Sequence, residues 1–465
     1  MKAQLLKPLK LCMKLLSWRS KMYDLILKNC NIINEDSIYE SDIAIKNDRI
    51  ELISSDIQAD SKEVIDVDGR YVMPGLIDDQ VHFREPGLTH KGDIASESFA
   101  GLAGGVTSYF EMPNVSPATT TLENLDKKFN LASQRSLSNY SFHLGATNSN
   151  LEEIKNVDIN KAAGLKVFMG ASTGDMLVDS IDALEGIFQY SPLNIVTHCE
   201  DTPRIRANEK SFAEKYGDDL SAIHHPYIRD AESCYLSSSL AVNLAKKHSS
   251  DLHVFHLSTE KEMSLFTSGS IDNKKITAEV CVHHLHFNNS DYKRLGNQIK
   301  CNPSIKEESD RSALVDAVNQ DKIDIIATDH APHTWDEKNM KYVDAPAGLP
   351  LIQHSLQILL DFYHDGIFSL EQIVRKTSHN TATRFQIKDR GFIREGYYAD
   401  LAIIDIKKPY TVDQSNILYK CGWSPFLNTT FKSSVFMTII NGNVAFKDGQ
   451  VNQSLPFGSQ IEFNR

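Results

Sequence analysis

The sequence is short of cysteine patterns, long apolar runs and basic residues, and each shortage argues against a class of protein. Its seven cysteines are scattered, odd in number and without CxxC spacing, so neither a disulfide framework nor a cysteine zinc site is expected, and a reducing cytoplasm is favoured. No apolar run approaches the roughly 18–20 residues needed to cross a bilayer. Acidic residues outnumber basic ones, 61 to 49, and the net charge of −12 argues against a general nucleic-acid-binding surface.

Internal repeats, low-complexity tracts and long linkers are also missing, which is typical of a soluble globular protein. The first 21 residues lack acids but carry six Lys and Arg residues among leucines. Pro8, Lys10 and Lys14 interrupt the apolar segment, which disfavours a secretory signal. We expect a disordered or dispensable basic extension over residues 1–21, with a basic surface helix or an organellar presequence as open alternatives.

Both ends of the remaining chain show short strands separated by turn residues. Residues 22–73 contain three such segments, and residues 389–465 contain ADLAIIDI and SVFMTIINGNVAFKDG, the latter turning at Asn441-Gly442. We expect the two ends to join in one small β-sandwich, followed by a C-terminal tail. Residues 74–388 between them form the predicted central domain.

Eight apolar runs in that central domain are typical of buried strands, and stretches compatible with helices separate them. Eight β–α units predict an α/β fold with a (β/α)8 TIM-like barrel. The runs are Leu76–His82, Val106–Met112, Ser141–Gly145, Leu165–Met169, Asn194–His198, Leu252–His256, Thr277–Val282 and Ile323–Asp329.

Chemically active side chains gather where these runs end. In a barrel, the C-terminal ends of all strands meet at one face. Imidazole is the usual zinc ligand and an aspartate completes such sites, so this gathering predicts a metal centre. Gln80 and His82 are two apart on a strand and therefore point to the same side. The residues at or near the strand ends are His82, Arg84, Asn114, His198, His256 and Asp329, and Lys166 lies inside the fourth run.

Each of these residues has a plainer interpretation. A lone histidine is more often structural than a ligand, and this is our prediction for His224, His225, His248, His253 and His379. Lys166 sits among apolar neighbours, where a charge is costly. Either carbamylation turns it into an anionic bridge between two metals, or it is a buried lysine whose ammonium reaches water.

Eight segments, in order, resemble the signatures of the dihydroorotases of the amidohydrolase superfamily. They are PGLIDDQVHFREPG, EMPNVSP, GLKVFMG, THCED, FHLST, ITAEVCVHHL, CNPSIK and ATDHAPH. The likeness runs from about Met22 to the closing strands. It implies a barrel, one or two Zn²⁺ ions, and the reversible cyclisation of N-carbamoyl-L-aspartate to dihydroorotate in pyrimidine biosynthesis.

The resemblance also implies a role for individual residues. His82, Lys166, His198, His256 and Asp329 match the metal ligands, with Lys166 as the carbamylated bridge. Asp329 also matches the general acid and base that works with metal-activated hydroxide. Arg84 and Asn114 match the pair that grips the substrate carboxylate, and Asn302 and His333 match further substrate contacts. Arg84 has the planar fork suited to a carboxylate.

Two departures from the family pattern stand out. Gln80 occupies the place of the first histidine of the H-x-H motif, and its carboxamide oxygen is a weaker zinc ligand than imidazole. Residues 345–350, which border the substrate in the family, are shorter than usual. Whether Gln80 binds metal stays open at this point.

Three functions remain as alternatives. The first is an active dihydroorotase, and HFREPG favours it because allantoinases resemble H-F-N-E-P-G there and neutral cyclic amides need no arginine. The second is another cyclic amide hydrolase of the allantoinase, hydantoinase or dihydropyrimidinase type. The third is a non-catalytic homologue that partners aspartate transcarbamoylase. Arg84 could instead be a surface residue paired with Glu85. We expect a small-molecule substrate, no nucleic-acid or membrane partner, and a homodimer.

Overall fold

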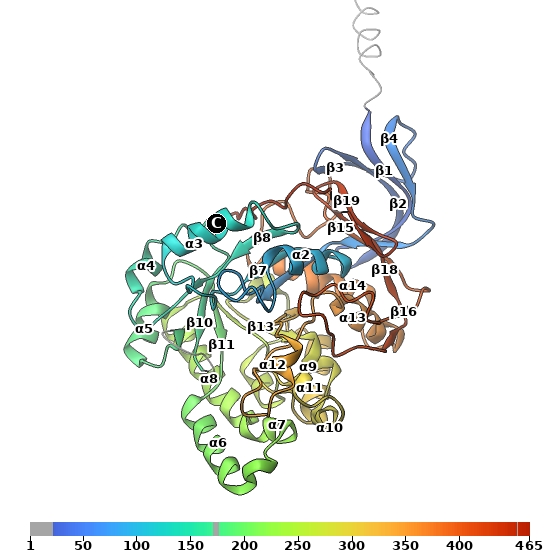
Figure 1. Ribbon diagram of the computed structural model, residues 1–465. Helices are drawn as coiled ribbons and strands as arrows, with labels where there is room; N and C mark the ends of the chain where they lie inside the picture. The colour runs from blue at the N-terminus through green and yellow to red at the C-terminus, as the bar shows by residue number, and fades with distance from the viewer. Residues whose placement is uncertain (1–21, 171–175, 453) are drawn as a thin grey trace, which may run out of the picture.

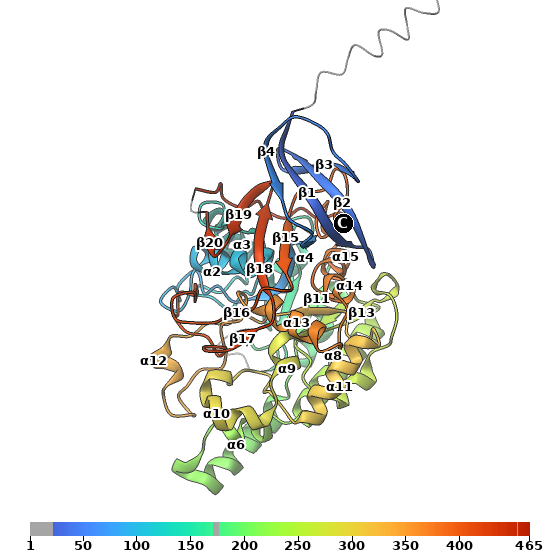
Figure 2. The same ribbon diagram turned by 90° about the vertical axis from the view of Figure 1, so that its right-hand side faces the viewer.

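The computed structural model describes residues 22–170, 176–452 and 454–465, so the predicted extension over residues 1–21 lies outside the described residues. The two ends of the chain meet in a β-rich unit, which stands beside the rest of the molecule in Figure 1. Its nine strands belong to one sheet in the order β20-β19-β18-β15-β5-β1-β2-β3, with β4 paired to β1. Figure 2 shows the C-terminal strands continuing the sheet that the N-terminal strands begin.

The strands of this unit are β1 (Tyr23–Asn34), β2 (Ser37–Lys46), β3 (Arg49–Ser54), β4 (Ser61–Asp66), β5 (Tyr71–Pro74), β15 (Leu401–Asp405), β18 (Ser434–Ile440), β19 (Asn443–Lys447) and β20 (Gln450–Val451). Buried side chains from both ends, such as Ile43 and Ile403, share one apolar core. The predicted turn at Asn441-Gly442 joins β18 to β19. Only glycine fits at 442, because an added Cβ would lie 2.1 Å from the carbonyl oxygen of Asn47.

The eight predicted runs form a closed barrel of parallel strands, which confirms the fold class. One sheet contains β6 (Leu76–Val81), β7 (Val106–Glu111) and β8 (Asn139–Phe142). The other contains β9 (Leu144–Gly145), β10 (Leu165–Phe168), β11 (Ile195–His198), β12 (Leu252–Val254), β13 (Ile276–Cys281) and β14 (Ile325–Ala327). The run at 141–145 supplies both β8 and β9, which meet at His143. A parallel bridge between Val81 and His330 closes the ring on the other side.

Helices surround the barrel, as Figure 1 shows. The longer ones are α2 (Ile94–Ala103), α3 (Leu122–Ala132), α5 (Ile181–Tyr190), α6 (Thr202–Tyr216), α8 (Ala231–His248), α11 (Glu308–Asn319) and α13 (Ser355–His364). Short helices lie in the connections: α4 (Leu151–Lys155), α7 (His225–Ile228), α9 (Val282–His286), α10 (Tyr292–Leu295), α12 (Trp335–Lys338), α14 (Leu370–Val374) and α15 (Asn380–Arg384). An acceptor at the N-cap begins several of them; Asp230, for example, accepts from the backbone N–H of Ser233 at α8.

The C-terminal segment returns to the barrel after the sheet. β16 (Tyr410–Thr411) and β17 (Thr430–Phe431) pair with each other, and the loop between them brings Trp423 against the barrel, where its indole N–H donates to the carbonyl of His333. The last residue, Arg465, donates to the carbonyls of Ile159, Ala162 and Ala163. The domain boundaries at 73/74 and 388/389 stay a prediction.

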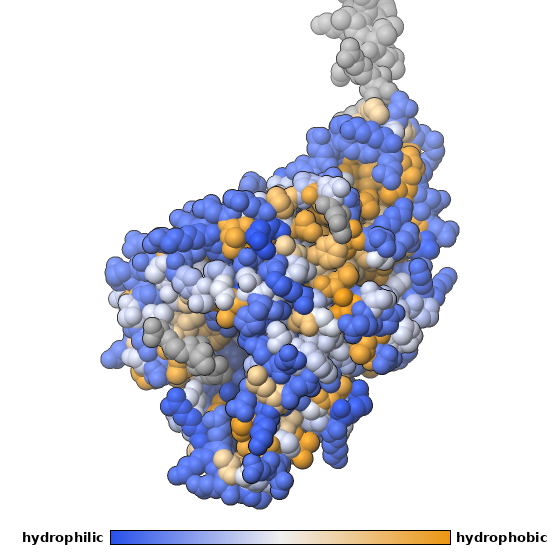
Figure 3. Space-filling view, viewed as in Figure 1, coloured by the Kyte–Doolittle hydropathy of each residue, from blue (hydrophilic) through white to orange (hydrophobic). Residues whose placement is uncertain are grey.

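The surface in Figure 3 is mostly hydrophilic, with its largest apolar area over the β-rich unit. Exposed apolar side chains of that unit include Ile38, Tyr39 and Val64. Among the described residues, none of the helices combines the length and apolarity that a membrane crossing requires.

Candidate active site

A pocket with about 500 Å³ of empty space opens at the C-terminal ends of the barrel strands. Its lining includes nine of the ten residues that the sequence singles out: Gln80, His82, Arg84, Asn114, Lys166, His198, His256, Asn302 and Asp329. Phe168, Ala331, Ala347 and Gly348 complete it. The tenth predicted residue, His333, lies outside the lining and contacts Arg84 from behind. Converging strand ends thus place distant residues around one cavity.

His82 lies between two oxygen atoms. Its Nδ1 donates to Asn114 Oδ1 at 2.9 Å, while its Nε2 lies 3.0 Å from Asp329 Oδ1. Burial lowers the pKa of His82, so the ring tends to be neutral and to carry one proton only. A neutral ring that donates at Nδ1 presents a lone pair at Nε2. Two electron-rich atoms then face each other, and a cation shared by them would satisfy both.

Gln80 contacts the same carboxylate from the face of β6 that it shares with His82. Its Nε2 donates to Asp329 Oδ1 at 3.3 Å, and its Oε1 accepts from the Cys281 thiol at 3.6 Å. The side chain is 1% exposed. The carboxamide is therefore part of the pocket floor.

His198 and His256 form a second pair of facing side chains, and here both groups are imidazoles. His198 Nδ1 lies 2.9 Å from His256 Nε2. On the other side of its ring, His198 Nε2 donates to Glu200 Oε2 at 2.9 Å, and Glu200 also pairs with Arg229. This carboxylate fixes the tautomer of His198 with the lone pair at Nδ1, the arrangement that supports a metal-binding histidine.

Lys166 reaches the pocket from β10 with its ammonium among apolar groups. The side chain is 1% exposed, and its Nζ lies 4.8 and 4.4 Å from the ring centres of Phe168 and Phe255. No carboxylate of the described residues lies within 4.0 Å of it. Burial lowers the pKa of Lys166 to about 8, so a substantial fraction is neutral amine near that pH.

Arg84 is buried in the pocket wall, which rules out the surface arginine that the sequence left open. Glu85 turns away and lies 3.3 Å from Arg135 instead. Arg84 Nε donates to the carbonyl of Pro332 at 3.0 Å, and one terminal nitrogen lies 3.1 Å from His333 Nε2. Within the described part of the chain, no carboxylate lies within 4.0 Å of this guanidinium. Burial lowers the pKa of Arg84 to about 10, so it remains a cation without a counter-ion.

Three residues of the site have left-handed backbone conformations. The φ angles are 69° at Arg84, 40° at His256 and 49° at Asp329. Such angles cost a non-glycine residue free energy of the order of 1–3 kcal/mol and cluster at functional sites. Each residue stands just beyond a strand, where this turn of the backbone directs the side chain into the cavity.

Several residues of the site escaped the sequence analysis. Glu200 was visible two residues after His198, but its bond to that ring was not predicted. Arg229 lies between two helices, and Lys91, which donates to His333 Nδ1 at 3.1 Å, lies late in the loop between β6 and α2. Gly348 also lines the pocket. Only glycine fits there, because an added Cβ would lie 2.5 Å from the Ala331 carbonyl oxygen. His253, predicted to be structural, lies in the barrel interior 3.3 Å from Glu279.

The described donors suit a zinc-type cation, because neutral imidazoles and a carboxylate face one another and His256 Nδ1 has no hydrogen-bond partner among the described residues. Comparison with known sequences agrees with this chemistry. The amidohydrolase family profile matches residues 71–445. The chain belongs to the amidohydrolase family.

Individual relatives carry several names. An allantoinase of Desulfitobacterium hafniense is 32% identical over 94% of this chain and 98% of its own. A dihydroorotase of Methanosphaera stadtmanae is 32% identical over 92% of this chain and 98% of its own. The solved L-hydantoinase (dihydropyrimidinase) of Arthrobacter aurescens is 27% identical and covers 95% of this chain and all of its own, with a TM-score of 0.89. The amidohydrolase chemistry is therefore shared, and the names of the relatives do not select one substrate.

Proposed function

We propose that this amidohydrolase is a dihydroorotase that interconverts N-carbamoyl-L-aspartate and dihydroorotate in pyrimidine biosynthesis. The observation that carries the proposal is the unpaired guanidinium of Arg84 in the pocket wall. A buried cation is costly without an anionic partner. Dihydroorotate brings a carboxylate into the pocket, whereas hydantoin, allantoin and dihydrouracil have none before their rings open.

Arg84 and Asn114 would hold that carboxylate from two sides. Arg84 offers a planar fork whose orientation the Pro332 carbonyl fixes. Asn114 lines the pocket beside His82. Asn302 adds a further contact, because its buried Oδ1 lacks a hydrogen-bond partner among the described residues and can accept from a substrate N–H. His333 holds Arg84 in place, with burial lowering its pKa to about 3 so that it adds no competing charge.

His82, Lys166, His198, His256 and Asp329 would hold one or two zinc ions, with Lys166 carbamylated. Zinc bound there would activate water and polarise the ring amide carbonyl. Asp329 accepts a proton from the attacking water and returns it to the leaving ring nitrogen, and it runs these transfers in reverse during cyclisation.

The test is turnover by the purified full chain supplied with Zn²⁺ or Mn²⁺. Loss of dihydroorotate is followed by its ultraviolet absorbance, beside hydantoin, dihydrouracil and allantoin. We expect dihydroorotate to give by far the largest kcat/KM. No turnover of dihydroorotate, with metal bound, would contradict the proposal.

A second candidate is an allantoinase or hydantoinase, which the names of the relatives favour. It predicts turnover of allantoin or hydantoin and none of dihydroorotate. The cytoplasmic location and the homodimer stay predictions, and light scattering of the purified protein measures the latter.

A further inference from the structure

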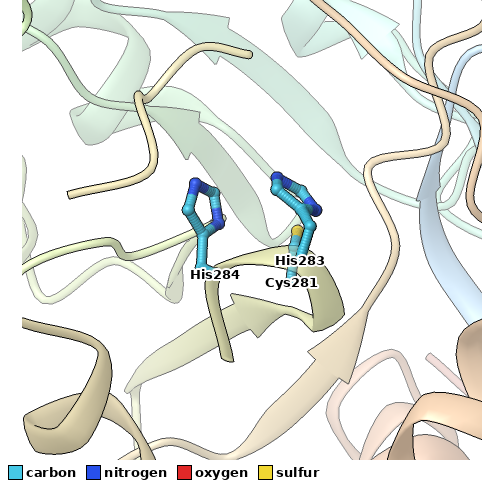
Figure 4. Close-up of side chains that lie close together, drawn as sticks. All are labelled: Cys281, His283 and His284. Carbon is cyan, nitrogen blue, oxygen red and sulfur yellow. The ribbon is translucent and has the colours of Figure 1, made fainter. Parts of the chain in front are cut away.

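A second group of metal-binding side chains lies directly behind the pocket. Cys281 ends β13, and His283 and His284 begin α9. One ligand atom from each of the three residues lies within 4.8 Å of the other two. Figure 4 shows the two imidazole rings side by side with the Cys281 sulfur next to them. None of these three residues belongs to the ligand set of the pocket.

The two histidines have ring nitrogens without hydrogen-bond partners among the described residues. His284 Nε2 donates to the carbonyl of Pro303 at 3.0 Å, which leaves Nδ1 without a proton. That Nδ1 is buried and has no hydrogen-bond partner among the described residues. A histidine that donates one N–H to a carbonyl is arranged as metal-binding histidines usually are.

His283 is fully buried and has no side-chain partner for either ring nitrogen within the described residues. The backbone of Thr328 is a polar neighbour of the ring. Buried polar atoms of this kind are rare in folded proteins and call for an explanation such as an ion. The ring lies 4.1 Å from that of His284, measured between centroids, so both can reach one ion.

Cys281 brings the soft donor. Its thiol now donates to Gln80 Oε1 at 3.6 Å or to Glu279 Oε1 at 3.8 Å. The carboxyl oxygen of Glu279 beside the sulfur favours a bound cation over a free thiolate. One sulfur with two imidazoles is a donor set that selects zinc and similar soft divalent ions over Mg²⁺ or Ca²⁺.

We propose that Cys281, His283 and His284 form a binding site for a soft divalent cation of the zinc class, separate from the metal ligands of the pocket. Binding releases the thiol proton to solvent and forms one metal–sulfur bond and two metal–nitrogen bonds. Sulfur and oxygen ligands of one tetrahedral zinc lie about 3.6 Å apart. Gln80 Oε1 is at that distance from the sulfur, so it is the nearest further donor. The scattered cysteine positions, without CxxC spacing, did not indicate such a site.

Cobalt(II) is the probe, because a thiolate bound to it gives a near-ultraviolet charge-transfer band that nitrogen and oxygen ligands do not give. The metal-free full chain is titrated with Co²⁺. We expect the band in the wild type, its loss in Cys281→Ser, and weaker cobalt binding in His284→Gln. The visible bands of cobalt bound in the pocket should remain in both variants.

The matched control is Cys234→Ser, since Cys234 is equally buried and touches Ser258 instead. It should keep the band, as should Cys199→Ser. Absence of the band in the wild type, or a band that survives Cys281→Ser, would overturn the proposal. If Cys281→Ser does not fold, X-ray absorption of the zinc-loaded wild type is the alternative measurement. The proposal requires a sulfur ligand in that spectrum. These readouts are independent of dihydroorotate turnover.

Discussion

The Oδ1 oxygen of Asp329 lies 3.0 Å from Nε2 of His82 and 3.3 Å from Nε2 of Gln80. One carboxylate thus joins the first barrel strand to the last across the pocket floor. Its left-handed backbone, with φ of 49°, aims it there. A group in this position can bind a cation and also exchange a proton with a substrate above it.

Asp329→Asn should therefore remove turnover while the fold survives. Asparagine keeps the shape and the contacts with neighbours but cannot accept the proton. We expect kcat to fall by about 10²–10⁴-fold, the usual contribution of a general base. Circular dichroism and the melting temperature check the fold. A variant with a near-normal rate would refute the assignment of the base.

Arg84→Ala should raise KM for dihydroorotate by about 10–100-fold, since a hydrogen bond to a charged group contributes about 1.5–3 kcal/mol. Dihydrouracil is the control substrate, because it lacks the carboxylate and its kinetic constants should change little. Arg84→Lys should recover only part of the loss, because an ammonium has no planar fork. If KM for dihydroorotate does not change, Arg84 is not the carboxylate clamp.

Glu200→Gln should weaken metal binding about 10–100-fold, as removal of outer partners of ligating histidines usually does. Glu200 fixes the tautomer of His198 through the 2.9 Å bond to Nε2. Glu185→Gln is the matched control, because Glu185 also pairs with a histidine, His248, but at the surface. Competition for zinc with a chromophoric chelator measures both affinities. Equal affinities in the two variants would show that Glu200 does not support a metal ligand.

The sequence predicted the barrel and singled out nine of the thirteen residues that line the pocket, for a simple physical reason. Apolar runs mark buried strands, and strand ends must converge on one face of a barrel. Position along the chain was therefore enough to bring His82 together with Asp329, which lies 247 residues away.

Residues that reach the site from loops could not be predicted in this way. Arg229 and Lys91 do not stand at the end of a barrel strand, and their partners are decided by long-range packing. The contact of Gln80 with Cys281 is similar, because it depends on the register between β6 and β13 across the barrel. His283 and His284 directly follow the seventh run, but nothing in their spacing shows which way their rings point.

Lys166 should carry the added mass of one CO2 in native protein, because its neutral amine can attack CO2 to give a carbamate and a proton. Lys128 is the internal control: it is equally buried but lies 2.8 Å from Glu111, a partner that favours the charged form of the lysine. Burial lowers the pKa of Lys166 to about 8, and the amine is the reactive form. Protein depleted of CO2 should regain activity when bicarbonate is added. This recovery should be faster as the pH rises towards about 8. Native mass spectrometry without the added mass would contradict the carbamate.

Gln80→His should strengthen zinc binding in the pocket. The carboxamide is buried on the same face of β6 as His82 and already touches Asp329 at 3.3 Å, so an imidazole there would meet the same cation. Imidazole is the better zinc ligand, and we expect slower loss of zinc to a chelator than in the wild type. Gln80→Leu is the companion variant, because it removes the oxygen but keeps a similar volume. Faster zinc loss from Gln80→Leu would mean that the carboxamide binds metal in the native protein. An unchanged rate of zinc loss from Gln80→His would show that position 80 lies beyond reach of the ion. The site would then have fewer metal ligands than the family's site.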